Sequence, residues 1–267
     1  MSTFRSKGVI IKKINLGEAD KILTIFTDNL GKIKVCARGA RRSTSKFGGH
    51  LDLLQVVDMM LAESRKTIPK IISVQTLYSS RHIRSNLEKT SAVYYLAELI
   101  DKFTLEGAKD TRIFNLLVDV LKILDRPDLH RSDKIFLLLR SFELKLLKIL
   151  GFLPEMVRCV RCRELLLTSG LSYFSALFGG VLCTACRRCD FSSFVISGNT
   201  IKILKVAVSC DFNFILQLQL EDNQKTEVKK ILEHLILFLL EKRLKSSKFI
   251  KKVEGLEKDN DHKLVSY

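Results

Sequence analysis

The sequence predicts a multidomain α+β chain, with a small β domain first and an all-α domain with a cysteine-rich insertion after it. Three observations lead to this prediction. β-Branched residues alternate with polar ones through the first 78 residues, and apolar residues recur at helical spacing after residue 86. Two C-x-x-C pairs interrupt the helical pattern between residues 155 and 190.

The N-terminal part has the composition of five short strands. They cover residues 7–14, 21–27, 32–38, 53–61 and 70–77. Asp28–Gly31 predicts a tight turn between the second and third strands, and Pro69 marks the start of the last one. The 53–61 segment also fits a helix. Five strands with a polar loop after the third are typical of a closed five-stranded barrel of the OB type.

The rest of the chain has helical periodicity on both sides of the insertion. Apolar stripes run from Val93 to Phe103 and from Ile135 to Ile149, and further helices are expected at 111–124, 201–208 and 226–244. We interpret these stripes as core. The predicted domains are an OB domain at 1–80, a helical domain at 81–154 and 191–250, a zinc-finger-like insertion at 155–190 and a flexible tail at 251–267.

The chain is strongly basic, with a formal net charge of +16 and a pI of about 9.6. Such a charge indicates a large anionic partner, either nucleic acid or an acidic membrane surface. No apolar run approaches the roughly 18 residues that a membrane span needs, and no secretory signal pattern follows Met1. The sequence therefore predicts a cytoplasmic protein without membrane association.

One stretch carries basic residues without any acid, because residues 31–51 contain no Asp or Glu. The candidate nucleic-acid contacts in it are Lys32, Lys34, Arg38, Arg41, Arg42 and Lys46. In a strand, side chains alternate between faces, so Lys32, Lys34 and Arg38 are expected in a row with apolar residues behind them. A basic strand face and a basic loop together suit phosphates. A solvated edge strand protected by lysines is the alternative.

Four of the seven cysteines have the spacing of a metal site. Cys159, Cys162, Cys183 and Cys186 form C-x₂-C-x₂₀-C-x₂-C, which is typical of a structural zinc site with four thiolate ligands. Cys189 makes a C-x₂-C-x₂-C run that could hold an iron–sulfur cluster, but the usual fourth cysteine before Pro is missing. We expect Zn²⁺ on the first four residues, Cys189 outside the site, and Cys36 and Cys210 in ordinary packing.

Known catalytic patterns are missing from the sequence. It has neither the GxxxxGK[ST] nor the GxGxxG motif, its acidic residues are scattered, and no histidine belongs to a set with a nucleophile and a carboxylate. We therefore expect no catalytic residues and interpret the chain as a binding protein. Two alternatives remain: a zinc-containing OB-fold factor that binds RNA, and a DNA repair enzyme with unrecognised catalytic groups.

The ordered motifs of the chain resemble those of the bacterial recombination mediator family RecO. They are GEADKILTIFT at 17–27, GKIKVCARGARRSTSKFGG at 31–49, AVYYLAELID at 92–101, FELKLLKILGFLP at 142–154, the CVRC and FSALFGGVLCTAC segments, and KSSKFI at 245–250. The resemblance implies an OB domain and a helical domain with a zinc-finger-like insertion. It also implies binding of single- and double-stranded DNA, annealing of complementary strands, and loading of recombinase onto coated DNA at the nucleoid.

The same resemblance implies two protein partners, RecR and the single-strand DNA-binding protein, whose acidic C-terminal tail binds the family's helical domain. It assigns Lys34, Arg38, Arg41, Arg42 and Lys46 to DNA contact, and the strand-face argument adds Lys32.

Few aromatic residues occur in the OB region, so phosphate contacts should dominate. Phe47 is a candidate for base stacking and equally a candidate for the core. Lys242–Lys252 is either a second basic surface or a solvated helix end.

Overall fold

The structure is a computed structural model that describes all residues except 1, 48, 64–67, 167–170, 251–252 and 254–267. The described chain forms two compact units. One contains residues 1–129 and the described residues from 244 onward, and the other contains residues 130–243. The predicted tail at 251–267 lies outside the described residues apart from Val253. Among the helices that are described, none is long and apolar enough to cross a bilayer.

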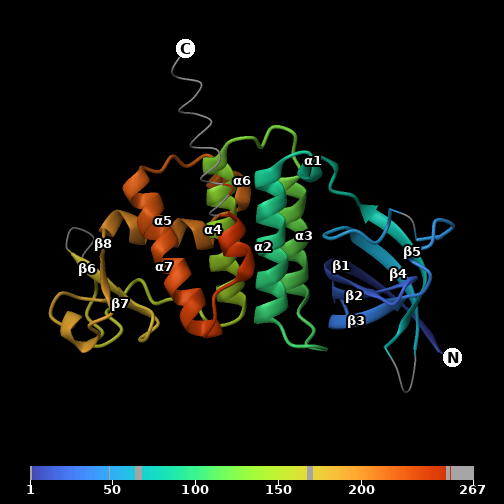
Figure 1. The fold of residues 1–267 in the computed structure, drawn as a ribbon. Helices are drawn as coiled ribbons and strands as arrows, with labels where there is room; N and C mark the ends of the chain where they lie inside the picture. The colour runs from blue at the N-terminus through green and yellow to red at the C-terminus, as the bar shows by residue number, and fades with distance from the viewer. Residues whose placement is uncertain (1, 48, 64–67, 167–170, 251–252, 254–267) are drawn as a thin grey trace, which may run out of the picture. The chain divides into compact units, whose positions relative to one another are not determined.

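The N-terminal strands form a closed barrel with the order β1-β2-β3-β5-β4 (Figure 1). The strands are β1 (Thr3–Leu16), β2 (Asp20–Thr27), β3 (Gly31–Ala37), β4 (Val56–Ala62) and β5 (Lys70–Tyr78). The predicted five-stranded sheet is confirmed, and the ambiguous 53–61 segment overlaps strand β4 rather than a helix. Alternate residues such as Ile10, Ile25 and Val35 fill the barrel interior and are fully buried.

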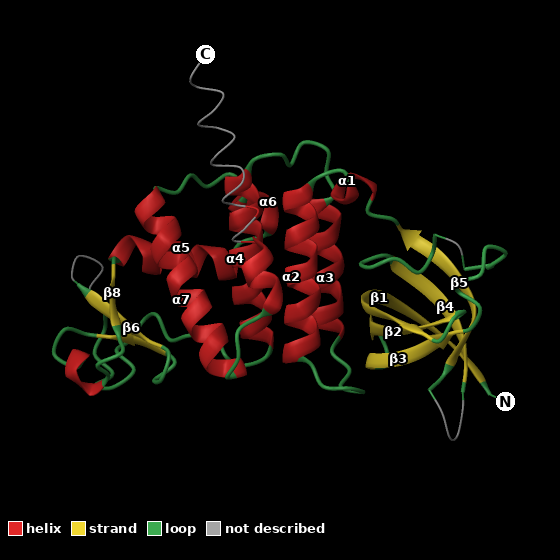
Figure 2. Ribbon diagram, in the orientation of Figure 1, coloured by secondary structure: helices red, strands yellow, loops and turns green. Residues whose placement is uncertain are grey.

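Helices of the same unit cover part of the barrel's outer surface. They are α1 (Arg81–Arg84), α2 (Leu87–Phe103) and α3 (Thr111–Leu124), and α2 and α3 both contact β1 (Figure 2). Asn86 and Asp110 cap α2 and α3 by accepting hydrogen bonds from first-turn amides. Val9 and Phe26 are register partners that point away from the barrel core, yet both are fully buried. These helices therefore leave only part of the barrel's outer face open to solvent.

The second unit is helical and carries the cysteine insertion, whereas the predicted helical domain also included residues 81–129. Its helices are α4 (Ser132–Ile149), α5 (Gly198–Ser209), α6 (Phe212–Ile215) and α7 (Asp222–Leu240), and α4 contacts the other three. The last helix ends before residue 244, because Glu241 takes a left-handed conformation with φ of 54°. The insertion, between α4 and α5, has a three-stranded sheet of β6 (Ser172–Ser175), β7 (Gly180–Leu182) and β8 (Phe194–Ile196), with the short helix η1 (Arg187–Cys189).

Candidate nucleic-acid interface and metal site

The end of β3 and the loop after it present a cluster of exposed cations. Along β3, Val35 and Ala37 point into the core and are fully buried, while Lys34 points outward and is exposed. Four more exposed cations follow in the strand end and loop: Arg38, Arg41, Arg42 and Lys46. We call these five residues the basic surface. No acidic residue lies in the segment that carries them, and the acid that pairs with Lys34, Glu106, comes from the segment between α2 and α3.

The loop of the basic surface is fixed to the turn between β1 and β2. The Gly39 amide donates to Oδ1 of Asp20 at 2.8 Å. Arg41 donates its amide to the Ala19 carbonyl at 2.9 Å and its Nη1 to the Gly17 carbonyl at 2.7 Å. One guanidinium donor of Arg41 is thus used inside the protein, so this residue also positions the loop. The loop is held in one place before any ligand arrives, which lowers the entropy cost of binding.

Phe47 belongs to the barrel core and does not offer a stacking surface. Its side chain is 4% exposed and packs with the residues inside the barrel. Lys46 places its Nζ 5.4 Å from the Phe47 ring centroid. Of the two interpretations that the sequence left open, anchoring of the loop is the one that the structure supports.

Lys32 lies on the expected face of β3, but the structure does not bring it to the surface with the other cations. It is 7% exposed, and its Nζ donates to the Asp101 carbonyl at 2.5 Å and approaches Asp101 Oδ1 at 3.4 Å. The segment between α2 and α3 covers it, since the Gly107 amide donates to the Lys32 carbonyl at 2.9 Å. A Cβ atom at Gly31 would lie 2.3 Å from the Ala108 carbonyl oxygen, so only glycine permits this approach. Strand alternation predicts which face Lys32 lies on, but it cannot predict a contact with a residue 69 positions away in the sequence.

The different surroundings of Lys32 give a first prediction. Lys32→Met should lower the free energy of unfolding by about 1–3 kcal/mol, because the Asp101 carbonyl loses a charged donor. It should leave the salt dependence of DNA affinity unchanged, since no phosphate contact is removed. Chemical denaturation and affinity titrations over a range of salt concentrations measure the two effects. A salt slope flattened by about one unit would instead make Lys32 a DNA contact.

The four predicted cysteines come together in the insertion, on two turns. The Sγ atoms of Cys159, Cys162, Cys183 and Cys186 all lie within 4.8 Å of one another, and those of Cys162 and Cys183 are 3.7 Å apart. Thiolates about 2.3 Å from a central zinc ion stand about 3.8 Å apart in a tetrahedron. The four side chains therefore suit a single metal ion without rearrangement of the backbone.

The electrostatics of the cluster also suit a cation. Burial opposes ionisation of Cys159, but amide groups of Cys162, Cys183 and Arg161 outweigh it and lower the pKa of this thiol to about 6. Burial and the neighbouring cysteines raise the pKa of Cys186 to about 12. One thiolate forms readily and further ones are resisted by its charge, so a bound divalent cation would stabilise the fully ionised set.

The two turns meet because the backbone of β7 comes close to the chain that leads into Cys159. The Val181 amide donates to the Glu155 carbonyl at 3.0 Å, and the Val181 carbonyl accepts from the Val160 amide at 2.9 Å. A Cβ atom at Gly180 would lie 2.6 Å from the Glu155 carbonyl oxygen, which explains the glycine. Cys189 is exposed and is not part of the four-sulfur group. The compact group does not include the third cysteine of the C-x₂-C-x₂-C run, so the geometry favours one ion over an iron–sulfur cluster.

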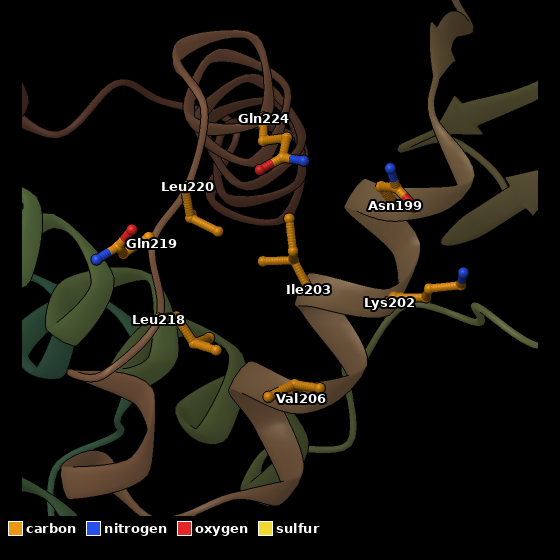
Figure 3. A pocket seen from close by; sticks show the side chains of 8 residues that line it. All are labelled: Asn199, Lys202, Ile203, Val206, Leu218, Gln219, Leu220 and Gln224. Atoms are coloured by element: carbon orange, nitrogen blue, oxygen red, sulfur yellow. The ribbon is translucent and has the colours of Figure 1, made fainter.

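A shallow groove in the second unit lies between α5 and the start of α7 (Figure 3). Its walls are mainly aliphatic, with Ile203, Val206, Leu218 and Leu220 facing the hollow. Lys202 is the one charged residue among the eight that line it. This lining suits an apolar side chain and has no pair of acidic and basic groups for catalysis.

The second basic cluster begins after α7. Lys242, Arg243, Lys245 and Lys248 are exposed, and Lys251 and Lys252 lie outside the described residues. Glu98 on α2 accepts hydrogen bonds from the amides of Lys245 and Ser246 at 3.0 and 2.8 Å. These bonds hold the start of the segment against α2 and leave its lysines in solvent, which suits both of the interpretations that the sequence allows.

Comparison with known proteins assigns the chain to a family. Residues 1–80 match the family model for the N-terminal part of recombination protein O, and residues 84–248 match the model for its C-terminal part. DNA repair protein RecO of Dehalococcoides mccartyi is 34% identical over 243 residues, which are 91% of this chain and 93% of the relative. DNA repair protein RecO of Roseiflexus is 32% identical over 253 residues, or 95% and 87% of the two chains. The protein therefore belongs to the RecO family of DNA repair proteins.

Proposed function

We propose that the protein is a recombination mediator that binds single- and double-stranded DNA through the basic surface. The observation that supports this most directly is the set of exposed cations on a loop that is already fixed to the barrel. Five cations without a neighbouring acid in their segment favour contact with phosphates. Contacts with phosphates are independent of base sequence, as a repair protein that acts throughout the genome requires.

The binding itself accounts for annealing. Two complementary strands repel each other through their phosphates, and cations that neutralise part of this charge lower the barrier to pairing. No covalent step is needed, so we propose that the protein acts by binding rather than by catalysis. With RecR, and by contact with the acidic tail of the single-strand DNA-binding protein, it helps load recombinase onto coated strands at the nucleoid.

We further propose that Zn²⁺ occupies the four-cysteine group and acts structurally. All four positions of a tetrahedron are supplied by protein thiolates, which leaves no position for a substrate or water. The metal would join the turns at Cys159–Cys162 and Cys183–Cys186 and so hold the two parts of the insertion together.

Annealing of DNA coated with the single-strand DNA-binding protein tests the function. The full chain should increase the rate at which coated complementary oligonucleotides pair, measured by the loss of fluorescence from a donor and quencher on the two strands. The increase should vanish at high salt, because phosphate contacts are lost. No increase at any salt concentration would contradict the proposal, and tighter binding to a matched RNA strand would favour an RNA-binding factor.

A further inference from the structure

The first three strands of the barrel place their outward side chains in a regular grid. Ile10 points into the core, and a bulge between Ile10 and Lys12 changes the alternation of β1. After this bulge Lys12, Ile14 and Leu16 point outward, on the same face as Lys34 of β3. The β1 face after the bulge thus joins the face that carries the basic surface.

The strand register then fixes which residues lie side by side. Ile14 pairs with Ile22, and Ile22 pairs with Cys36, which gives one row across three strands. The row beside it runs from Lys12 through Thr24 to Lys34. On the other side, Arg38 follows the end of β3.

The Ile14 row is open to solvent. Ile14 is 51% exposed, and Ile22 and Cys36 are half-buried. Neighbouring strands lie about 4.8 Å apart, so the row is about 10 Å long. Two acids lie beside these rows: Asp20 accepts the Gly39 amide at 2.8 Å and helps to hold the loop, and Glu106 forms an ion pair with Lys34. The result is an exposed apolar strip with Lys12 and Lys34 in the row on one side and Arg38 on the other side.

This arrangement matches the chemistry of a single DNA strand. Its bases have apolar faces that can leave the stack and pack on a protein surface, while its phosphates need cations nearby. In a duplex the bases are stacked on one another, so an apolar strip has nothing to pack against. We propose that Ile14, Ile22 and Cys36 form a platform for unstacked bases, with Lys12, Lys34 and Arg38 on the phosphates. The inference rests on the proposed DNA binding, and it gives a single strand a contact on the barrel face that a duplex lacks.

The test compares Ile14→Ser with Leu77→Ser, a matched change at an aliphatic residue that is 48% exposed at the far end of β5. Fluorescence anisotropy with a labelled oligodeoxythymidylate and with a duplex of equal length gives the affinities. Ile14→Ser should weaken single-strand binding about three- to ten-fold and change duplex binding less than about two-fold. Its salt slope should equal that of the wild type, because no charge is lost. Leu77→Ser should match the wild type on both ligands.

Two results would overturn the platform. One is an unchanged single-strand affinity of Ile14→Ser, and the other is an equal loss on single strand and duplex, as a general disturbance or a protein-docking role would give. These results differ from a failure of the proposed function, in which the wild-type chain itself binds neither ligand.

Cys36 supplies a second measurement that needs no substitution. Oligodeoxythymidylate at saturation should slow the reaction of Cys36 with N-ethylmaleimide at least about three-fold, read from the mass of the peptide that contains it. Cys210, half-buried in the other unit, should react at an unchanged rate. Equal labelling of Cys36 with and without DNA would remove it from the platform.

Discussion

Replacing Arg38 and Arg42 together by alanine should weaken DNA binding roughly 10- to 100-fold at low salt and flatten its salt dependence. Each lost phosphate contact removes about 0.9 from the slope of log affinity against log salt for a duplex and about 0.7 for a single strand. Two contacts should therefore lower the slope by about 1.8 and 1.4. Both arginines are exposed, and among the described residues neither has an ion-pair partner, so the fold should be unaffected. Anisotropy titrations at several salt concentrations measure the change.

Glu106 offers a control of opposite sign for the same measurement. It forms an ion pair with Lys34, and both side chains are about half exposed. Glu106→Gln removes an acid that competes with phosphate for Lys34, so it should strengthen binding about two- to five-fold. Removal of positive charge should therefore weaken DNA binding, and removal of negative charge should strengthen it, if the basic surface is the DNA site. An unchanged slope for the arginine variant would place the DNA site on another part of the chain.

The choice of Arg38 and Arg42 depends on information that only the structure supplies. Local patterns were sufficient to predict the five strands, most of the helices and the grouping of four cysteines, because each depends on residues close in sequence or on fixed ligand spacing. They were not sufficient for Lys32, which is covered by residues from the segment between α2 and α3. The same applies to Arg41, whose bond to Gly17 depends on the turn between β1 and β2.

The outward position of Ile14, on which the proposed platform depends, also could not be predicted from local patterns. Strand alternation alone would place Lys13 rather than Ile14 outward, because a regular strand that starts with Ile10 inside keeps every even residue inside. The bulge between Ile10 and Lys12 reverses the alternation, and no residue type at these positions predicts a bulge from the sequence. Pairing across strands, not local propensity, decides which side chains reach the outer face of the barrel.

Replacing Cys159 by serine should remove the metal from the protein and destabilise the insertion. Cys159 is fully buried, and its Sγ also accepts the Cys183 amide at 3.4 Å, so the change affects both turns of the site. Loss of one of four ligands from a structural site should lower the stability of the insertion by several kcal/mol, since metal-binding energy is folding energy in such modules (on the order of 10 kcal/mol for a whole site). Metal analysis should fall from about one zinc ion per chain to near zero, and limited proteolysis should begin between residues 155 and 190.

Cys189→Ser is the matched control for this change. Cys189 lies three residues beyond Cys186, is exposed, and is outside the four-sulfur group, so its serine variant should keep the metal and resist proteolysis like the wild type. Metal loss in the Cys189 variant would show that this residue is a ligand, and iron in the purified wild-type protein would show that the site holds an iron–sulfur cluster and not zinc.

If the metal acts only structurally, DNA binding by the basic surface should survive in the Cys159 variant, because the five cations of that surface lie in the other compact unit. An equal loss of DNA affinity would instead mean that the insertion takes part in binding.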